Sequence, residues 1–299
     1  MIGKSVRPSR EPLYSEGNRE QFPIPPEYER VEYMDFIRSH VKNRDLILIS
    51  QSLCQNYFCG IFASHKKLSY GRTISWWIAK DYDDIFSVIR QKWEEGQFVY
   101  SLVADDTTGI FGAFLIKGYG NGQKIIPYDA LNDTGFDSVA DLLKLWEEVR
   151  YDKRTTDVVA LGDITSITSN GSTYYIVITD NAIGYHGRRQ TYFTGRHWPD
   201  VENQIWISNN NGFNITSICY NEGLQEYLVV MTLSCDRQSW FKSGDASERS
   251  YWMSEMSILG YHPSLIFDDQ IDDKILVVMT SDSDRSPGHF FRANYQLVW

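Results

Sequence analysis

The six histidines could act as metal ligands or proton carriers, but their positions assemble neither kind of site. They are His40, His65, His186, His197, His262 and His289. None lies at metal-ligand spacing from another histidine or a cysteine, and the nearest pair is His186 and His197, in GYHGRRQTYFTGRHW. An exposed loop is the simpler interpretation of this pair, with a metal site as the alternative. The sequence predicts no metal and no cofactor.

Other residues with chemical potential are better explained as structure. The cysteines Cys54, Cys59, Cys219 and Cys235 form no zinc-binding pattern and predict reduced core thiols. Acidic pairs lie at expected turns but lack the glycine and terminal glutamate of a calcium loop; they are Asp105–Asp106, Asp268–Asp269, Asp272–Asp273 and Asp282 with Asp284. The sequence contains no Gly-x-Ser-x-Gly elbow and no phosphate-binding glycine-rich loop. No catalytic residue is predicted.

One segment is basic in an otherwise acidic chain. Residues 186–197 contain five basic or titratable cationic side chains and no acid, whereas the whole chain has a net charge of −10. These side chains are His186, Arg188, Arg189, Arg196 and His197. Arginine pairs with carboxylates through two parallel hydrogen bonds. We identify the segment as a candidate binding site for a carboxylate-rich partner; the alternative is a loop that balances acids elsewhere in the fold.

The overall charge argues against two classes of partner. A net charge of −10 opposes general binding to nucleic-acid phosphates and to anionic membranes. The sequence has no run of 18 apolar residues, and its first residues lack the apolar core of a signal peptide. We therefore expect a cytoplasmic protein that binds neither nucleic acid nor membrane.

Internal repeats organise the chain. The segments Gly212–Thr232 and Gly260–Thr280 both end in LVVMT, and their first glycines lie 48 residues apart. Three weaker copies lie upstream, at Gly96–Ile116, Asp163–Thr179 and Leu46–Ala63. The serine that ends the first apolar strand sets the register of the copies; these serines are Ser50, Ser101, Ser166, Ser217 and Ser264.

A short amphipathic helix is predicted before each copy. The helices are expected at Glu32–Lys42, Asp83–Glu95, Phe136–Val149, Pro199–Ser208 and Tyr251–Leu259. Trp93, Trp146 and Trp206 fall on their apolar faces, and three glycines are expected to end helices: Gly96, Gly212 and Gly260. Two strands joined by a polar turn follow each helix, and a third strand, such as Gln190–Phe193 or Gln238–Phe241, is expected after them.

The predicted fold class is mixed α and β, rich in β. It has about five helix-plus-three-strand repeats, closed as a propeller-like ring, because the apolar strands need cover on both faces. Open stacking is the alternative. Residues 1–27 are expected to form an extended N-terminal arm, and residues 28–299 a single repeat domain. Its units span about 28–77, 78–128, 129–197, 198–244 and 245–299.

The repeats resemble a known but uncharacterised family. The pattern of a tryptophan, Gly-aromatic, Ile-Thr-Ser and a Val-Val-Met strand runs from Trp206 through GFNITSICY to YLVVMT, and a related pattern starts at Trp93. It resembles the repeat domain found C-terminal to the kinase in plant casein-kinase-I-like proteins and in bacterial proteins, over roughly residues 80–285. No kinase motif accompanies it. The resemblance therefore implies an accessory module without catalytic residues.

These observations favour a non-enzymatic protein-binding scaffold or adaptor. We expect an accessory subunit of a larger intracellular complex, such as a bacterial signalling or defence complex, with another protein as its partner. One alternative is a hydrolase-type enzyme with a site in the central channel of the ring. Another is a carbohydrate-binding module, because the chain contains 9 Trp and 19 Tyr.

Overall fold

The structure is a computed structural model. It describes residues 46–54, 57–64, 74–105, 109–117, 121–129, 159–168, 172–180, 189–234, 236–269, 271–281 and 295–298. The expected arm at residues 1–27 lies outside the described residues, as do the helices expected at 32–42 and 136–149.

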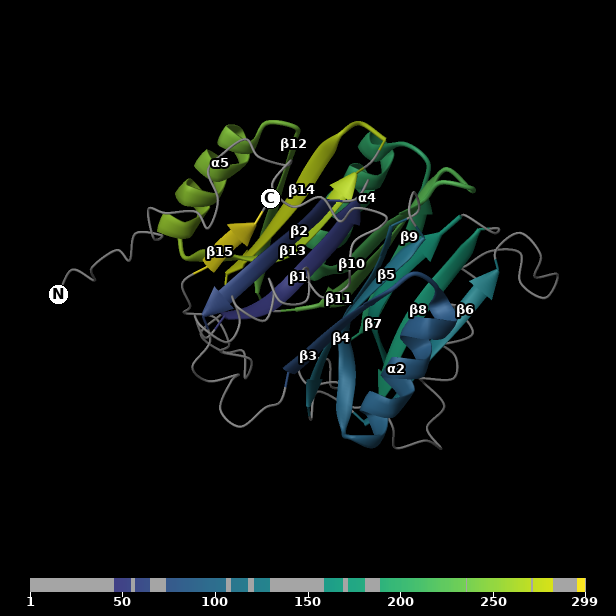
Figure 1. Ribbon diagram of the computed structural model, residues 1–299. Coiled ribbons are helices and arrows are strands. Elements are labelled where there is room, and N and C mark those ends of the chain that lie inside the picture. Colours follow the sequence, from purple (N-terminus) through teal and green to yellow (C-terminus); the bar gives the residue numbers. More distant parts are fainter. Residues whose placement is uncertain are drawn as a thin grey trace. The chain divides into compact units, whose positions relative to one another are not determined.

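The described strands form five three-stranded sheets, and every strand pair is antiparallel (Figure 1). In spatial order, the strands of the first two sheets are β3 (Ile74–Ala79), β5 (Ile110–Lys117) and β4 (Gln97–Asp105), and β6 (Asn121–Asp129), β8 (Thr173–Asp180) and β7 (Val159–Ile167). The next two sheets contain β9 (Gln190–Gly195), β11 (Glu226–Leu233) and β10 (Phe213–Asn221), and β12 (Arg237–Ser243), β14 (Lys274–Ser281) and β13 (Tyr261–Asp269). The fifth sheet contains β15 (Tyr295–Val298), β2 (Tyr57–Ser64) and β1 (Leu46–Cys54).

The sheets share one internal plan, which confirms the repeats. Each sheet contains a hairpin whose second strand is central, so the YLVVM and KILVVM segments are the middle strands β11 and β14, as predicted. The first strand of every hairpin carries a register shift at the same place. The residues skipped are Ile49, Tyr100, Gly162, Thr216 and Ser264.

The order of elements within a unit differs from the prediction of a helix followed by three strands. The strand that precedes a helix pairs with the hairpin that follows it, so β9 pairs with β11. The strands expected at Gln190–Phe193 and Gln238–Phe241 therefore belong to the next hairpin rather than to the previous one. In the units of α2, α4 and α5, the order is strand, helix, strand, strand. In the sheet of β1 and β2, the third strand is β15, from the other end of the chain.

The predicted propeller-like ring is wrong. The chain divides into a central unit, Thr73–Ser234, and a terminal unit of Met1–Arg72 with Cys235–Trp299. In the central unit β4 contacts β7 and β7 contacts β10, so the sheets form an open row of three; in the terminal unit β1 contacts β13. None of the described sheets closes into a ring. The apolar strands that suggested a ring obtain their second covering surface from a neighbouring sheet or helix instead.

Two core clusters in the central unit show how the strands are covered. Side chains alternate along β8, so Tyr175 and Val177 face one cluster while Tyr174 and Ile176 face the other. The first cluster contains side chains from helix α2 (Tyr82–Glu94), including Ile85 and Ile89. The second contains β10 and β11 side chains, including Cys219, Leu228 and Val230. The middle sheet is thus buried on both faces.

Three helices are described, each of 13 residues: α2, α4 (Trp198–Asn210) and α5 (Ala246–Ile258). They agree with the helices predicted at Asp83–Glu95, Pro199–Ser208 and Tyr251–Leu259, although α5 begins five residues earlier. Its start is fixed by the Asp245 carboxylate, which accepts hydrogen bonds from the Ser247 and Glu248 N–H groups at 2.7 and 3.1 Å. No described helix is long and apolar enough to cross a membrane.

Candidate functional site

The basic loop predicted as a binding site is not a compact patch where the structure describes it. His186 and Arg188 lie outside the described residues. Arg189 and Arg196 are exposed, but they flank opposite ends of the paired strand β9. Seven residue steps along a strand correspond to about 23 Å. Arg189 and Arg196 therefore do not meet.

The two ends of β9 have different surroundings. The Arg189 carbonyl accepts a hydrogen bond from the Leu233 N–H at 2.7 Å. His197 occupies the N-cap position of α4, and its side chain makes no capping hydrogen bond. Neither arginine forms an ion pair with an acid in the described part of the chain. A binding role for this segment stays a prediction.

Of the tryptophans predicted to pack within the repeat, one is packed, one is exposed and one is not described. Trp93 packs against the core cluster that contains Ile85 and Ile89 of α2, and its indole N–H donates to Gln123 Oε1 at 3.0 Å. Trp206 was expected to be packed in the same way, but its side chain is 53% exposed. That prediction is wrong, because the indole lies on the solvent side of α4, one residue beyond the buried Ile205. Trp146 lies outside the described residues.

The three glycines end their helices as predicted. Gly96, Gly212 and Gly260 have φ values of 73°, 85° and 86°, in the left-handed region that favours glycine. Each N–H donates to a carbonyl in the last turn of the preceding helix, at 2.9 to 3.1 Å. These residues are structural and do not contribute to a binding site directly.

Asp163, a partly buried acid on β7, has an unusual environment. The residue after the skipped position is Ser50, Ser101 or Ser217 in three repeats, and in the third repeat it is Asp163. The predicted register at Ser166 was therefore three residues too late. The mistake arose because Ser166 is the only serine on that strand. In the fifth repeat the equivalent residue is Leu265, one residue after the predicted Ser264.

Asp163 joins strands from three sheets. Its Oδ2 accepts a hydrogen bond from the Leu102 N–H of β4 at 2.8 Å, and its Oδ1 accepts one from the Ser217 hydroxyl of β10 at 2.8 Å. Burial raises the pKa of Asp163 to about 6, although hydrogen bonds from Leu102, Ser217, Ile164 and Ser101 oppose the shift. The groups that act on the pKa of Asp163 are two backbone N–H groups and two serine hydroxyls, with no charged side chain among them. We interpret the group as a structural link between sheets.

Two glutamines provide a second kind of link between sheets. The Gln123 amide on β6 accepts from the Val99 N–H and donates to the Val99 carbonyl, both at 2.7 Å. Gln190 on β9 makes the same pair of bonds to Leu161 on β7, both at 3.0 Å. Val99 and Leu161 each precede the skipped residue of their strand. The contact is thus repeated between successive sheets.

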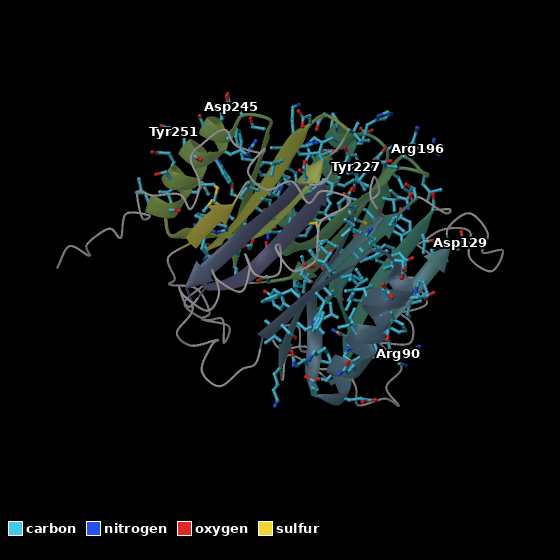
Figure 2. The ribbon with its side chains drawn as sticks, in the orientation of Figure 1. Arg90, Asp129, Arg196, Tyr227, Asp245 and Tyr251 are labelled. Atoms are coloured by element: carbon cyan, nitrogen blue, oxygen red, sulfur yellow. The ribbon has the colours of Figure 1, made fainter. Side chains whose placement is uncertain are left out.

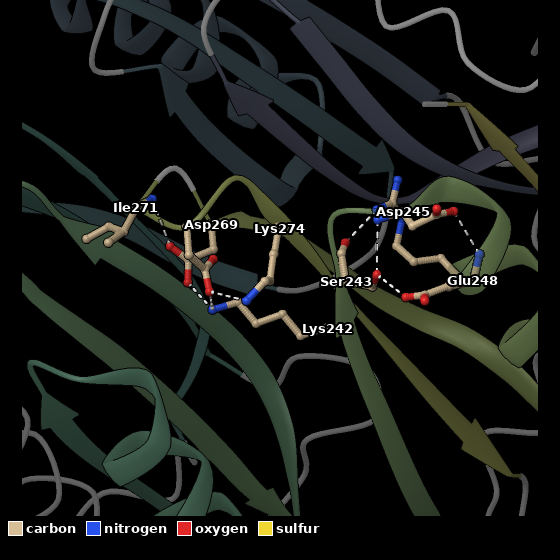
Figure 3. A network of polar contacts seen from close by, with 9 residues as sticks. Lys242, Ser243, Asp245, Glu248, Asp269, Ile271 and Lys274 are labelled. Atoms are coloured by element: carbon tan, nitrogen blue, oxygen red, sulfur yellow. Dashed lines mark hydrogen bonds and ion pairs between the residues drawn. The ribbon is translucent and has the colours of Figure 1, made fainter.

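A buried ion pair in the terminal unit could be mistaken for a catalytic pair. The Lys242 ammonium contacts the fully buried Asp269 carboxylate and also lies 3.2 Å from Asp272 (Figure 3). Asp269 in turn accepts the Ile271 N–H at 3.1 Å, and Lys274 lies 3.2 Å from Asp272. Both partners are engaged in holding the β13–β14 turn. We interpret this network as structural.

No metal-binding arrangement is found in the described part of the chain. No group of three or more His, Cys, Asp or Glu side chains could hold an ion there. Cys219 is buried, in agreement with the prediction of core thiols.

The surface feature that stands out is on the outer faces of the helices. Each helix buries an equivalent pair of side chains, which fixes its alignment with the others: Ile85 and Ile89, Val201 and Ile205, Arg249 and Met253. Equivalent residues are 116 apart between α2 and α4 (198 minus 82) and 48 apart between α4 and α5 (246 minus 198). The same offsets relate the three helix-ending glycines.

With this alignment, the outer faces differ in chemistry. Exposed apolar side chains are found on α4, on α5 and at the C-cap residue of α5. The exposed fractions are 53% for Trp206, 48% for Ile207, 69% for Tyr251, 73% for Ile258 and 69% for Leu259. The equivalent α2 residues are all polar: Arg90, Gln91, Ser87, Glu94 and Glu95. Exposed apolar side chains are therefore not a requirement of the repeat fold.

The apolar residues also occupy different positions on α4 and α5. Ser254 and Glu255 of α5 stand where α4 has its tryptophan and isoleucine, while α4 has asparagine at the positions of Tyr251, Ile258 and Leu259. Figure 2 shows the labelled Tyr251 on the outer side of α5. Each helix thus has its own exposed face. We define the α5 face as Tyr251, Ser254, Glu255, Ile258 and Leu259.

Sequence reasoning missed the α5 face because it treated the helix apolar residues as core. A signal was available. When the helices are aligned by the 48-residue repeat, Tyr251 falls at the position of Asn203 and Ile258 at the position of Asn210. Because asparagine is a polar residue, these positions are expected to face outward. The helix start was also predicted too late, and this obscured the alignment.

No protein-family model matches the sequence, and no curated protein is detectably similar to it.

Proposed function

We propose that the chain is a non-enzymatic protein-binding scaffold or adaptor, whose partners bind to the outer faces of its repeat helices. The observation that carries the proposal is the exposure of Tyr251, Ile258 and Leu259 on α5 at positions where α2 has Ser87, Glu94 and Glu95. Large exposed apolar groups contribute to binding when a partner removes them from water.

The packing of the helices on the repeat supports this role. Both α4 and α5 pack on the sheets that flank them, and each ends at a glycine with a fixed left-handed conformation. A rigid helix loses little conformational freedom when a partner binds. The resemblance to a domain that accompanies other domains agrees with an accessory role in a larger intracellular complex.

The two alternative functions, hydrolase and carbohydrate-binding module, are not equally supported. A hydrolase site in the channel of a ring has lost its structural basis, because the described sheets form no ring. A carbohydrate-binding module has one observation in its favour. Trp206 is half exposed on α4, with Asn203 and Asn210 on the same side of the helix. Binding of oligosaccharides that is lost in Trp206→Ser would support that second candidate.

The proposal is tested by quantitative affinity capture from an extract of the source organism. Three variants are compared with the unaltered chain: Tyr251→Ser with Ile258→Ser on α5, Trp206→Ser with Ile207→Ser on α4, and Gln91→Ser with Glu94→Ser on α2 as the matched control. All six residues are exposed, so the variants should fold.

The expected result is a reproducible protein partner that is lost with the α5 or the α4 variant and retained with the α2 variant. Recovery of the same proteins with all four chains would contradict the proposal. A measurable hydrolytic activity of the purified chain would also contradict it.

A further inference from the structure

We infer that the α5 face binds a basic amphipathic helix of a partner protein. This inference rests on the proposed function and goes beyond it by naming the chemistry of the partner. It depends on the spacing of the apolar side chains of α5, on the charge of the surrounding exposed residues and on the secondary structure that presents them.

The apolar side chains are spaced as in a helix–helix contact. Tyr251 and Ile258 are seven residues apart, which places them on one side of the helix about 10 Å apart along its axis. Leu259 follows directly and is equally exposed. Between them lies Ser254, whose small side chain leaves room for a large residue of a partner. Apolar anchors separated by two helical turns are typical of a helix that packs against another helix.

The charged groups of α5 are all of one sign where they are exposed. Asp245, Glu248 and Glu255 are exposed, whereas Arg249, the one basic residue of the helix, is only 2% exposed. Asp245 caps the helix and Glu248 accepts a hydrogen bond from the Ser243 hydroxyl at 2.7 Å (Figure 3). These bonds leave both negative charges in place. Glu255 belongs to the α5 face itself.

The negative charge of α5 favours some binding partners over others. A second copy of the chain would bring the acids of one α5 against the acids of the other, which is unfavourable. An anionic membrane would be repelled for the same reason. A partner with lysine or arginine beside its apolar residues satisfies both the apolar and the acidic groups. Because the face belongs to a helix and presents no strand edge, the partner cannot bind by adding a strand.

The test measures binding of a fluorescently labelled model peptide to the full chain by anisotropy. The peptide is a helix of about 18 residues, with leucine on one side and lysine on the other. Its matched control has glutamate in place of every lysine. The protein variants are Tyr251→Ser with Ile258→Ser, Glu255→Gln, and Gln91→Ser with Glu94→Ser as a control on the exposed side of α2.

The lysine peptide should bind and the glutamate peptide should not. The α5 double variant should weaken binding by about tenfold or more, as expected when two central apolar anchors are removed. Glu255→Gln should weaken binding less and reduce its dependence on salt. The α2 variant should bind the peptide as the unaltered chain does.

Several outcomes would overturn the inference. They are absence of peptide binding, equal binding of the glutamate peptide, unchanged affinity of the α5 double variant, and a homodimer that dissociates when Tyr251 and Ile258 are replaced. Failure here is distinguishable from failure of the proposed function. If the peptide does not bind but a captured partner is still lost with the α5 or α4 variant, the protein-binding role stands and only the basic-helix partner is wrong.

Discussion

Asp163 places a carboxylate where three other repeats have serine. An ionised carboxylate only accepts hydrogen bonds, whereas a serine hydroxyl can also donate one. Ser217 donates to Asp163 and accepts from the Ile164 N–H at 3.0 Å, so one hydroxyl serves both bonds. The acid receives hydrogen bonds from Leu102, Ser217, Ile164 and Ser101. Burial costs an ionised acid more than a neutral one. The ionisation of Asp163 should therefore make a contribution of its own to the pH dependence of stability.

The first prediction concerns this response. Because the pKa of Asp163 is raised from 3.8 to about 6 in the folded chain, folding favours its protonated form. The free energy of unfolding should fall as pH rises from about 4 to above 6. Relative to Asp163→Asn, the loss should be about 2–3 kcal/mol, since each pKa unit corresponds to about 1.4 kcal/mol.

Chemical denaturation at a series of pH values measures this difference. The comparison between the two chains removes the contribution of other titrating groups. If the difference between the two stabilities stays constant from pH 4 to 7, Asp163 has an ordinary pKa and the account of its burial is wrong.

A second residue-scale prediction separates the two tryptophans. Trp93→Ala should lower the free energy of unfolding by about 2–4 kcal/mol, because it removes a packed ring and the hydrogen bond to Gln123. Trp206→Ala should cost less than about 1 kcal/mol, because more than half of its side chain is already exposed. Equal losses in thermal or chemical denaturation would contradict this assignment.

At the scale of elements, the glutamine links explain how one strand is held against the next sheet. Gln123 satisfies both the N–H and the carbonyl of Val99. These backbone groups lie beside the register shift, where ladder hydrogen bonding is interrupted. A side chain with one donor and one acceptor at its end is suited to this position. Gln190 repeats the arrangement on Leu161.

The third prediction follows from these links. Gln123→Leu should lower the free energy of unfolding by about 2–4 kcal/mol, because it leaves two backbone groups and the Trp93 N–H without their partner. The matched control is Gln91→Leu on the exposed side of α2, which should change stability by less than about 0.5 kcal/mol. Similar effects of the two substitutions on the denaturation midpoint would argue against the link.

The fourth prediction tests the helix ends. Gly260 has a φ of 86°, and a Cβ built there would meet nothing within 4 Å, so only backbone strain opposes a side chain. Gly260→Ala should destabilise the chain by about 1–2 kcal/mol. Gly260→Asn should cost less, since asparagine tolerates the left-handed region. Calorimetry that ranks asparagine below alanine would count against a strained left-handed end.

For the whole molecule, the repeat could be predicted from sequence but the arrangement of repeats could not. The shared LVVMT ending and the glycines 48 residues apart identified the two hairpins and their central strands. Strand order was missed because a hydrophobic pattern does not say which neighbour a strand pairs with, so the strand predicted at Gln190–Phe193 was given to the wrong hairpin. The ring was inferred from the need for cover on both faces, and an open row of sheets meets that need equally well.

The candidate site was harder to predict for a related reason. A helix with apolar residues at several positions does not reveal which of them face the core. On α5 the buried positions belong to Arg249 and Met253, while Tyr251 and Ile258 are exposed. A core position filled by arginine reverses the usual pattern. Likewise, the basic segment was treated as one compact patch although a strand was expected at Gln190–Phe193. That strand spans Gln190–Gly195 and separates Arg189 from Arg196.

The measurement that tests the central claim most directly is hydrogen–deuterium exchange of the chain, alone and with its captured partner. The account predicts that the partner slows exchange in α5, with α4 as a second site, and leaves α2 unchanged as an internal control. The Tyr251→Ser and Ile258→Ser variant should show no slowing in α5 at the same partner concentration. Slowed exchange confined to the hairpin turns or to α2, with α4 and α5 unchanged, would contradict the claim that the outer helix faces bind partners.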